Sequence, residues 1–281
     1  MTKHEDGTGR GLSPLVGMAL EEDIGTGDVT TELTVPAERR ASGAFYAREP
    51  MVVAGAELLP VIYELLGGVE SIELLKHSGD RAEPGGCIAR VRGSARLLLT
   101  AERTALNFIQ RLSGVATLAR QFSEAVAGTK CRILDTRKTT PGLRALEKMA
   151  AAAGGITNHR QGLFDAILIK NNHITAAGGV RAALSAVAGQ TIPVEIEVRT
   201  LAELDEALEC GARRLLLDNL TPEQASGWVA RIAGRATIEL SGGITLETAR
   251  AYAEAGADFV SAGAITHSAR ALDINFRLAL D

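Results

Sequence analysis

A repeat in the second half of the chain constrains the fold most: short apolar runs that end in charged residues, asparagine or glycine. They predict strands near 131–134, 166–170, 193–198, 214–217, 236–240 and 258–261. A helical pattern follows most of them. This alternation predicts a parallel β/α barrel with its active site at the carboxyl ends of the strands. Because a closed barrel has eight strands, the pattern indicates an incomplete barrel, or further strands near 155–157 and 273–278.

Length and composition exclude several classes of protein. A chain of 281 residues can bury a full core, and its net charge of −4 favours neither nucleic acid nor an anionic membrane. No apolar run is long enough to span a bilayer, and the polar residues 1–11 are expected to be a loose tail without a signal peptide. Three widely spaced cysteines form no metal-binding pattern and predict reduced, mostly buried thiols in a cytoplasmic protein.

The first half is predicted to be an α+β layer with a mostly antiparallel sheet. Ser13 and Pro14 begin a helix that runs to about Glu22, and the segment from Gly25 to Thr34 is expected to be extended. Further strands are expected at 41–48, 69–76 and 87–92, with a helix at 55–66.

A long helix should follow Ser94, with an apolar stripe toward the core and Arg103 on the opposite, polar stripe. Gly114 is expected to separate it from a second helix that ends near Gly128.

Two glycine-containing loops after the last two strands predict a phosphate site. They are Ser241-Gly242-Gly243 and Ala262-Gly263-Ala264. Small residues allow backbone N–H groups to approach an anion, and a following helix directs its positive end there. The alternative is that these glycines only turn the chain.

Basic residues gather at the predicted strand ends and favour a substrate with several negative groups. The cluster comprises Arg137, Lys138, His159, Arg160 and Lys170, with Arg144 as a further candidate. Cations buried together need anionic partners. A solvated surface is the alternative. Lys170 could also form a Schiff base if its cationic neighbours lower its pKa.

Four acidic residues lie in or after the same strands: Glu195, Glu197, Asp218 and Glu239. Glu195 and Glu197 share one face of a strand. Such carboxylates can accept hydrogen bonds from sugar hydroxyls, hold a divalent cation or stabilise a developing carbocation. For Glu195 and Glu239 we favour structural pairing with the nearby cations.

Motifs along nearly the whole chain from Leu15 resemble the quinolinate phosphoribosyltransferase family. The motifs lie at 22–31, 102–107, 135–142, 158–160, 168–174, 195–198, 217–219, 241–244, 262–268 and 271–273. The resemblance implies an α/β sandwich at 13–113, with 273–281 returning to it, and an open, seven-stranded barrel at 114–272. It also implies that quinolinate and phosphoribosyl pyrophosphate give nicotinate mononucleotide, pyrophosphate and carbon dioxide in NAD synthesis, with Mg²⁺.

The resemblance further implies roles for individual residues. Arg103, Arg137, His159 and Arg160 would hold the two quinolinate carboxylates, with Thr136 and Lys138 close by. Lys138 and Lys170 would meet phosphates, and the glycine loops at 241–243 and 262–264 would take the 5′-phosphate. Glu197 and Asp218 would face the ribose and the metal. Arg103 would come from the neighbouring subunit of a homodimer. Family members commonly have Asp where Asn171 stands, so no charge-based role is expected for residue 171.

Three other interpretations stay open at this point. A paralogue associated with molybdenum transport would share the phosphate loops, but the set Arg137, His159 and Arg160 favours quinolinate. A Schiff-base barrel lyase would use Lys170. A non-catalytic phosphoribosyl-binding or scaffold protein would be expected to lose Glu197, Asp218 or Lys138, and all three are present.

Overall fold

The computed structural model describes residues 13–280, so the expectation for residues 1–11 lies outside the described part. Two compact units divide the described residues: 13–117 with 269–280, and 118–268. Among residues 13–280, no helix combines the length and apolar character needed to cross a membrane. Of the cysteines, only Cys131 is buried, and Cys87 and Cys210 are partly exposed, so the expectation of mostly buried thiols is wrong.

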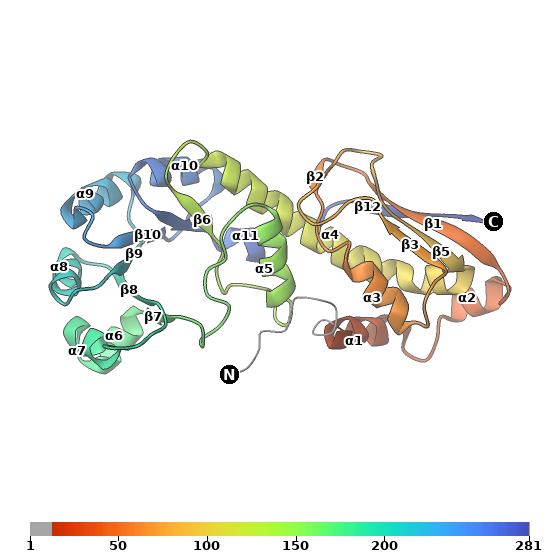
Figure 1. Ribbon diagram of the computed structural model, residues 1–281, viewed down its shortest axis with the longest axis horizontal. Helices are drawn as coiled ribbons and strands as arrows, with labels where there is room; N and C mark the ends of the chain where they lie inside the picture. The colour runs from red at the N-terminus through yellow and green to blue at the C-terminus, as the bar shows by residue number, and fades with distance from the viewer. Residues whose placement is uncertain (1–12, 281) are drawn as a thin grey trace. The chain divides into compact units, whose positions relative to one another are not determined.

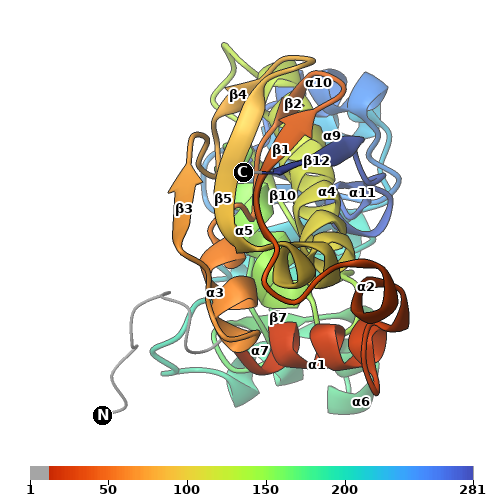
Figure 2. The same cartoon turned by 90° about the vertical axis from the view of Figure 1, so that its right-hand side faces the viewer.

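The first unit contains an antiparallel four-stranded sheet in the order β12-β1-β5-β3. These strands are β1 (Arg40–Ala47), β3 (Ser71–Leu74), β5 (Cys87–Ser94) and β12 (Ile274–Leu280). A short pair joins β2 (Met51–Val52) to β4 (Arg81–Ala82). The helices are α1 (Ser13–Ile24), α2 (Val29–Thr34), α3 (Leu58–Leu65) and the first part of α4 (Ala95–Ala125). Along one face of the sheet runs α4 (Figures 1 and 2). The predicted antiparallel layer is therefore confirmed.

Two local predictions in this unit were wrong. Residues 29–34 form a helix instead of an extended segment, because Asp28 caps it by accepting a hydrogen bond from the Thr31 N–H at 3.0 Å. Gly114 does not end a helix, since α4 continues through it to Ala125. A Cβ atom at residue 114 would lie 1.9 Å from the Arg270 carbonyl oxygen, so this glycine permits close backbone approach instead of a turn.

The second unit contains a parallel sheet in the order β6-β11-β10-β9-β8-β7. The strands are β6 (Arg132–Leu134), β7 (Ile167–Ile169), β8 (Val194–Val198), β9 (Arg214–Asp218), β10 (Thr237–Ser241) and β11 (Phe259–Ser261). All six agree with the sequence prediction. Of the further barrel strands expected, the segment near 155–157 makes only an isolated parallel bridge from Thr157 to Leu134. The strand expected near 273–278 is β12, which belongs to the antiparallel sheet of the first unit. Strand pairing does not join β7 to β6 within the described residues, so the barrel is open.

Helices follow the strands of this unit, and several of them lie outside the arc of strands (Figure 1). They are α5 (Arg144–Ala153), α6 (Asn171–Ala177), α7 (Val180–Ala186), α8 (Leu201–Glu209), α9 (Pro222–Ile232), α10 (Leu246–Glu254) and α11 (Ala264–His267). Capping boxes begin α8 at Thr200 and α9 at Thr221. Since the strands are parallel, their carboxyl ends meet at one end of the barrel.

Candidate active site

A cavity of about 390 Å³ opens at the carboxyl ends of the barrel strands. Every strand of the second unit contributes to its lining, either from its own last residues or from the residues that follow. The predicted site residues in the lining are Thr136, Arg137, Lys138, His159, Arg160, Lys170, Glu197, Asp218, Ser241, Gly242 and Gly243. Residues far apart in sequence therefore converge because the strand ends converge.

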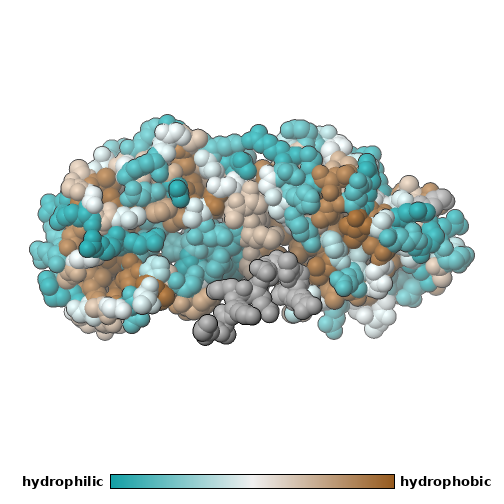
Figure 3. Space-filling view, in the orientation of Figure 1, coloured by the Kyte–Doolittle hydropathy of each residue, from teal (hydrophilic) through white to brown (hydrophobic). Residues whose placement is uncertain are grey.

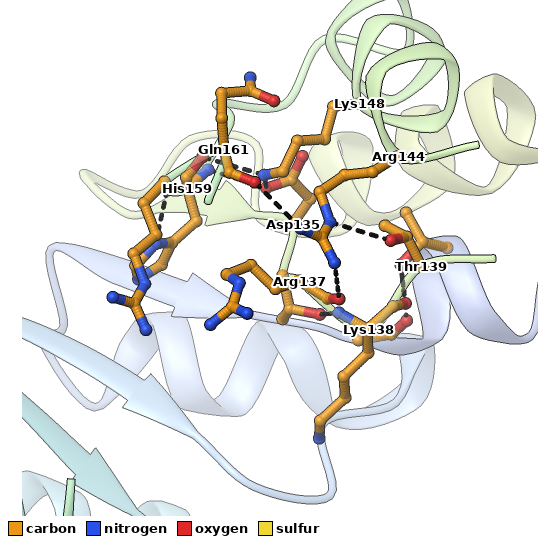
Figure 4. Close-up of polar contacts among 12 residues, drawn as sticks. Asp135, Arg137, Lys138, Thr139, Arg144, Lys148, His159 and Gln161 are labelled. Atoms are coloured by element: carbon orange, nitrogen blue, oxygen red, sulfur yellow. Dashed lines mark hydrogen bonds and ion pairs between the residues drawn. The ribbon is translucent and has the colours of Figure 1, made fainter. Parts of the chain in front are cut away.

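The first basic group follows β6. Lys138 N–H donates to Thr136 Oγ1 at 3.1 Å, and the Lys138 carbonyl accepts a 2.7 Å hydrogen bond from Thr266 Oγ1. These bonds fix the turn from which the Arg137 and Lys138 side chains project (Figure 4). A Cβ atom on Gly263 would lie 3.1 Å from Lys138 Cδ, so the small residue leaves room for the lysine stem.

The second basic group, His159 and Arg160, follows the Thr157 bridge. Arg160 Nη1 donates to the Ala166 carbonyl at 3.1 Å. Burial, together with the positive charge of Arg137, lowers the pKa of Arg160. The described residues place no carboxylate within ion-pair distance of Arg137, Lys138 or Arg160. Like charges held together without a carboxylate partner favour binding of an anionic molecule.

Carboxylates occupy the opposite part of the cavity. Glu197 is buried, and its Oε1 lies 2.9 Å from Arg199 Nη2, while its Oε2 lies 3.9 Å from Lys170 Nζ. Asp218 Oδ2 accepts a hydrogen bond from the Asn219 amide at 2.6 Å and lies 3.8 Å from Arg199 Nη2. Two carboxylates on neighbouring strands offer the oxygen ligands that Mg²⁺ prefers, although Arg199 competes for both.

The Ser241-Gly242-Gly243 loop packs closely against the end of β9. Asn219 N–H donates to the Ser241 carbonyl at 2.9 Å. Gly242 has a φ of 103°, and a Cβ atom there would lie 2.7 Å from the Asn219 backbone nitrogen. Only glycine fits this position without moving the neighbouring strand end. The other glycine loop, Ala262-Gly263-Ala264, is not part of the cavity lining, although Ser261 directly before it is.

In the wall of the cavity, His159 lies between two buried carboxylates. Its Nε2 is 3.4 Å from Glu195 Oε2 and 3.4 Å from Glu239 Oε2. Both glutamates therefore pair with the ring of His159, one of the basic residues of the predicted cluster. The ligand atoms of these three residues lie within 4.8 Å of one another, and the Nε2 side of the His159 ring faces both carboxylates.

Burial opposes a positive charge on His159, but the carboxylates of Glu195 and Glu239 outweigh it and raise the pKa of the ring to about 9. His159 Nδ1 accepts the Arg160 N–H at 2.7 Å. The proton between ring and acids therefore lies on the Nε2 side. When the cluster of His159 and its two glutamates binds a second proton, Glu239 shares that proton, because burial raises the pKa of its carboxyl group.

We expect the free energy of unfolding to decrease as the pH rises from 6.5 to about 9. Because the folded-state pKa of His159 is above its unfolded value, its proton stabilises the fold fully below pH 6.5 and no longer above the folded pKa. The largest change is roughly 3 kcal/mol. Urea unfolding at several pH values in this range gives the free energy of unfolding as a function of pH. This free energy should fall less steeply with pH for His159→Gln than for the wild type. The control His77→Gln, which replaces an exposed histidine, should keep the pH dependence of the wild type. An equal pH dependence for all three proteins would contradict this prediction.

Some features of the site differ from the sequence expectation. Arg103 is exposed on α4 in the first unit and is not among the lining residues. Arg199 was not predicted as a site residue. It is a basic residue directly after a strand, which is the same signal that identified Lys170. Arg144 donates to Thr139, Gln161 and Arg137 within the site segments and is absent from the lining. Lys170 is half exposed and close to Glu197, which does not give the desolvated surroundings that a Schiff-base lysine needs.

Comparisons with known proteins agree with this architecture. Residues 28–113 match the N-terminal domain of quinolinate phosphoribosyl transferase, and residues 115–277 match its C-terminal domain. The chain is 44% identical to the nicotinate-nucleotide pyrophosphorylase [carboxylating] of Mycobacterium leprae, over 92% of this chain and 94% of the relative. A probable enzyme of the same name from Bacillus subtilis is 40% identical, over 96% and 94% of the two chains.

Solved structures give the same result. The nicotinate-nucleotide pyrophosphorylase of Francisella tularensis superposes with a TM-score of 0.92 at 36% identity, over 99% of this chain and 100% of the other. The enzyme from Ehrlichia chaffeensis superposes with a TM-score of 0.91 at 34% identity, over 95% and 98%. With both domain models matched in order and relatives matched over nearly their full length, this chain belongs to the quinolinate phosphoribosyltransferase family.

Proposed function

We propose that this enzyme transfers the phosphoribosyl group of phosphoribosyl pyrophosphate to quinolinate with decarboxylation. The products are nicotinate mononucleotide, pyrophosphate and carbon dioxide, in de novo NAD synthesis. One observation supports this most: Arg137, Lys138 and Arg160 line one cavity without a carboxylate partner in the described part of the chain. Two adjacent carboxylates on a flat ring match such a group of cations.

The proposed roles follow the positions of the side chains. Arg137 and Arg160, with Thr136 and Lys138 beside them, bind the quinolinate carboxylates. His159 supports this group through its own partners, since its Nε2 faces Glu195 and Glu239 and its Nδ1 accepts the Arg160 N–H. Lys138 and Lys170 also meet the phosphates of the second substrate. Backbone N–H groups of the loops at 241–243 and 262–264 bind the 5′-phosphate, since the first loop lies shortly before α10 and the second contains the first residue of α11.

In the reaction, the bond between ribose C1 and the pyrophosphate oxygen breaks, and quinolinate N1 forms the new bond to C1. The C2 carboxylate then leaves as carbon dioxide, its bonding electrons remain on C2, and a proton is taken up there. Positive charge develops on the ribose as the first bond breaks. Glu197 and Asp218 are placed to stabilise that charge and to accept hydrogen bonds from the ribose hydroxyls.

Mg²⁺ is the proposed metal, and it would be held mainly by substrate phosphates, with Glu197 and Asp218 as protein ligands. Their carboxylate chemistry fits the ion, while the pairing of both with Arg199 fits a ligand that arrives with the substrate. When bound, the ion would neutralise negative charge on the phosphate oxygens.

Replacing Glu197 or Asp218 by Ala is expected to lower kcat at least tenfold while changing the KM for quinolinate about twofold or less. A carboxylate that faces a cationic transition state acts chiefly when the charge develops, so its loss affects the chemical step. Steady-state kinetics with both substrates varied measures this. Glu209→Ala, an exposed glutamate at the end of α8, serves as the control. A change confined to the KM for quinolinate would show that the assigned role is wrong.

We further propose a homodimer in the cytoplasm, with Arg103 of each chain entering the active site of its partner. Large apolar side chains on the surface support an interface: Met18, Leu33, Leu163 and Phe164 are between 68% and 81% exposed. Figure 3 shows apolar areas bordered by polar surface on both units. A dimer interface that covers these side chains would remove apolar surface from water.

A mass-spectrometric assay with quinolinate, phosphoribosyl pyrophosphate and Mg²⁺ tests the proposed function. The expected products are nicotinate mononucleotide and pyrophosphate in equal amounts. A preparation that is folded by circular dichroism and yields no nicotinate mononucleotide over a range of pH and Mg²⁺ concentrations would refute the proposal.

A further inference from the structure

Three charged residues on one face of α5 connect the two segments that carry the basic side chains of the cavity. Arg144, Glu147 and Lys148 are spaced i, i+3 and i+4, so they share a helix face. We call residues 135–140 the first arm, which carries Arg137, and residues 157–161 the second arm, which carries Arg160. Figure 4 shows side chains of α5 directed at both arms.

Lys148 makes the central connection. Its Nζ donates to Asp135 Oδ1 at 2.5 Å in the first arm and to the His159 carbonyl at 2.9 Å in the second. Asp135 Oδ1 also accepts the His159 N–H at 2.8 Å, and the Asn158 amide nitrogen faces Asp135 Oδ2 at 2.7 Å. Lys148 and Asp135 are both fully buried. One lysine thus joins the start of the first arm to the backbone of the second.

Arg144 and Glu147 hold the outer parts of the arms. Arg144 donates to Thr139 Oγ1 at 3.1 Å and to the Arg137 carbonyl at 3.4 Å in the first arm, and to the Gln161 carbonyl at 3.4 Å in the second. The buried carboxylate of Glu147 accepts from the Thr140 N–H at 3.0 Å and the Thr140 hydroxyl at 2.7 Å. All three side chains bind polar groups of the arms and leave the cavity itself to other residues.

The arms need such support because they hold guanidinium groups of the same charge near each other. Without an anion, repulsion between Arg137 and Arg160 favours separation of the arms. A buried ion pair contributes little net stability compared with apolar packing, but its hydrogen bonds are directional and fix a geometry. The Lys148–Asp135 pair is therefore better suited to fixing a geometry than to adding net stability.

We propose that α5 is a clamp: Arg144, Glu147 and Lys148 are positioning residues that fix the spacing between Arg137 and Arg160 to match two adjacent carboxylates. This inference rests on the proposed function, because quinolinate is the ligand with that pair of groups. None of the three residues touches the reacting atoms. The clamp therefore governs recognition of the dicarboxylate ring more than that of the phosphoribosyl donor.

Lys148→Met is expected to raise the KM for quinolinate about tenfold or more and to change the KM for phosphoribosyl pyrophosphate about twofold or less, since small displacements of binding groups have large effects. Calorimetry with phthalate, which has the same adjacent carboxylates and no reactive ring nitrogen, should show a similar loss of affinity. Benzoate, with one carboxylate, should bind wild type and variant about equally weakly.

The double variant Lys148→Gln with Asp135→Asn keeps a hydrogen bond between two neutral amides. It should recover most of the affinity for phthalate that the single variant Lys148→Gln loses.

A matched control distinguishes the effect of displaced binding groups from the effect of lower protein stability. Leu146→Ala removes a buried side chain from the same helix, so it should lower the unfolding temperature without raising the KM for quinolinate. If Lys148→Met does not fold, Glu147→Gln gives the corresponding test at the first arm, with an expected rise of about threefold or more in the same KM. Two results would overturn the proposal of a clamp. One is a similar rise in the KM values of Lys148→Met for quinolinate and for phosphoribosyl pyrophosphate. The other is an equal rise in the KM for quinolinate in Leu146→Ala at an equal loss of stability. Failure of the wild-type protein to turn over quinolinate would refute the proposed function instead, and phthalate binding would still test the clamp.

Discussion

Arg137→Ala is expected to lower the turnover of quinolinate by about 10²-fold or more. Arg137 lies in the cavity beside Arg160, and within the described part of the protein no carboxylate lies within ion-pair distance of it. The Lys138 N–H donates to Thr136 Oγ1 and fixes the backbone turn that carries Arg137, so the substitution removes a positive charge from a defined part of the cavity. Steady-state kinetics measures the loss, and Arg132→Ala, an exposed arginine on β6, is the matched control.

The same reasoning predicts substrate selectivity in the unmodified protein. Nicotinate lacks one of the two carboxylates, so it would leave part of the half-buried pair Arg137 and Arg160 without an anionic partner, which is unfavourable. We expect kcat/KM for quinolinate to exceed that for nicotinate by at least about 10²-fold, and Arg137→Ala to reduce this ratio. Comparable kcat/KM values for the two substrates in the wild type would refute the dicarboxylate site.

The barrel half could be predicted from the sequence because its signals are local. Each strand is a short apolar run, and each functional group lies directly after one, as with Lys170 after β7 and Asp218 at the end of β9. Parallel strands then bring these groups together without further information. The same rule would have identified Arg199, which follows β8 and pairs with Glu197.

Features that depend on distant contacts could not be predicted in this way. Gly114 looks like a helix end until Arg270, far along the chain, is seen to occupy the space of its missing side chain. The Lys148–Asp135 pair and the two carboxylates beside His159 are also tertiary contacts, and neither has a local sequence signature. At 29–34, β-branched residues favoured an extended chain, and a single cap from Asp28 reversed that preference.

Mixing two inactive variants, Arg103→Ala and Lys138→Ala, is expected to restore about a quarter of the wild-type activity. Arg103 is exposed on α4 of the first unit, whereas Lys138 lines the cavity of the second. In a two-fold dimer with shared sites, each site takes its barrel from one chain and Arg103 from the other. A mixed dimer then has one site with both defects and one site with neither. Random exchange makes about half of the dimers mixed, and half of their sites are intact.

A second mixture shows whether any recovery comes from shared sites. Arg137 and Lys138 both line the cavity of the same unit, so every site in a mixed dimer of Arg137→Ala and Lys138→Ala keeps one defect. That mixture should therefore stay inactive under the conditions that restore the first. Subunit exchange is followed by mass spectrometry of differently tagged chains. If exchange is complete and the Arg103→Ala mixture recovers no more activity than this control, Arg103 does not act in the partner's site.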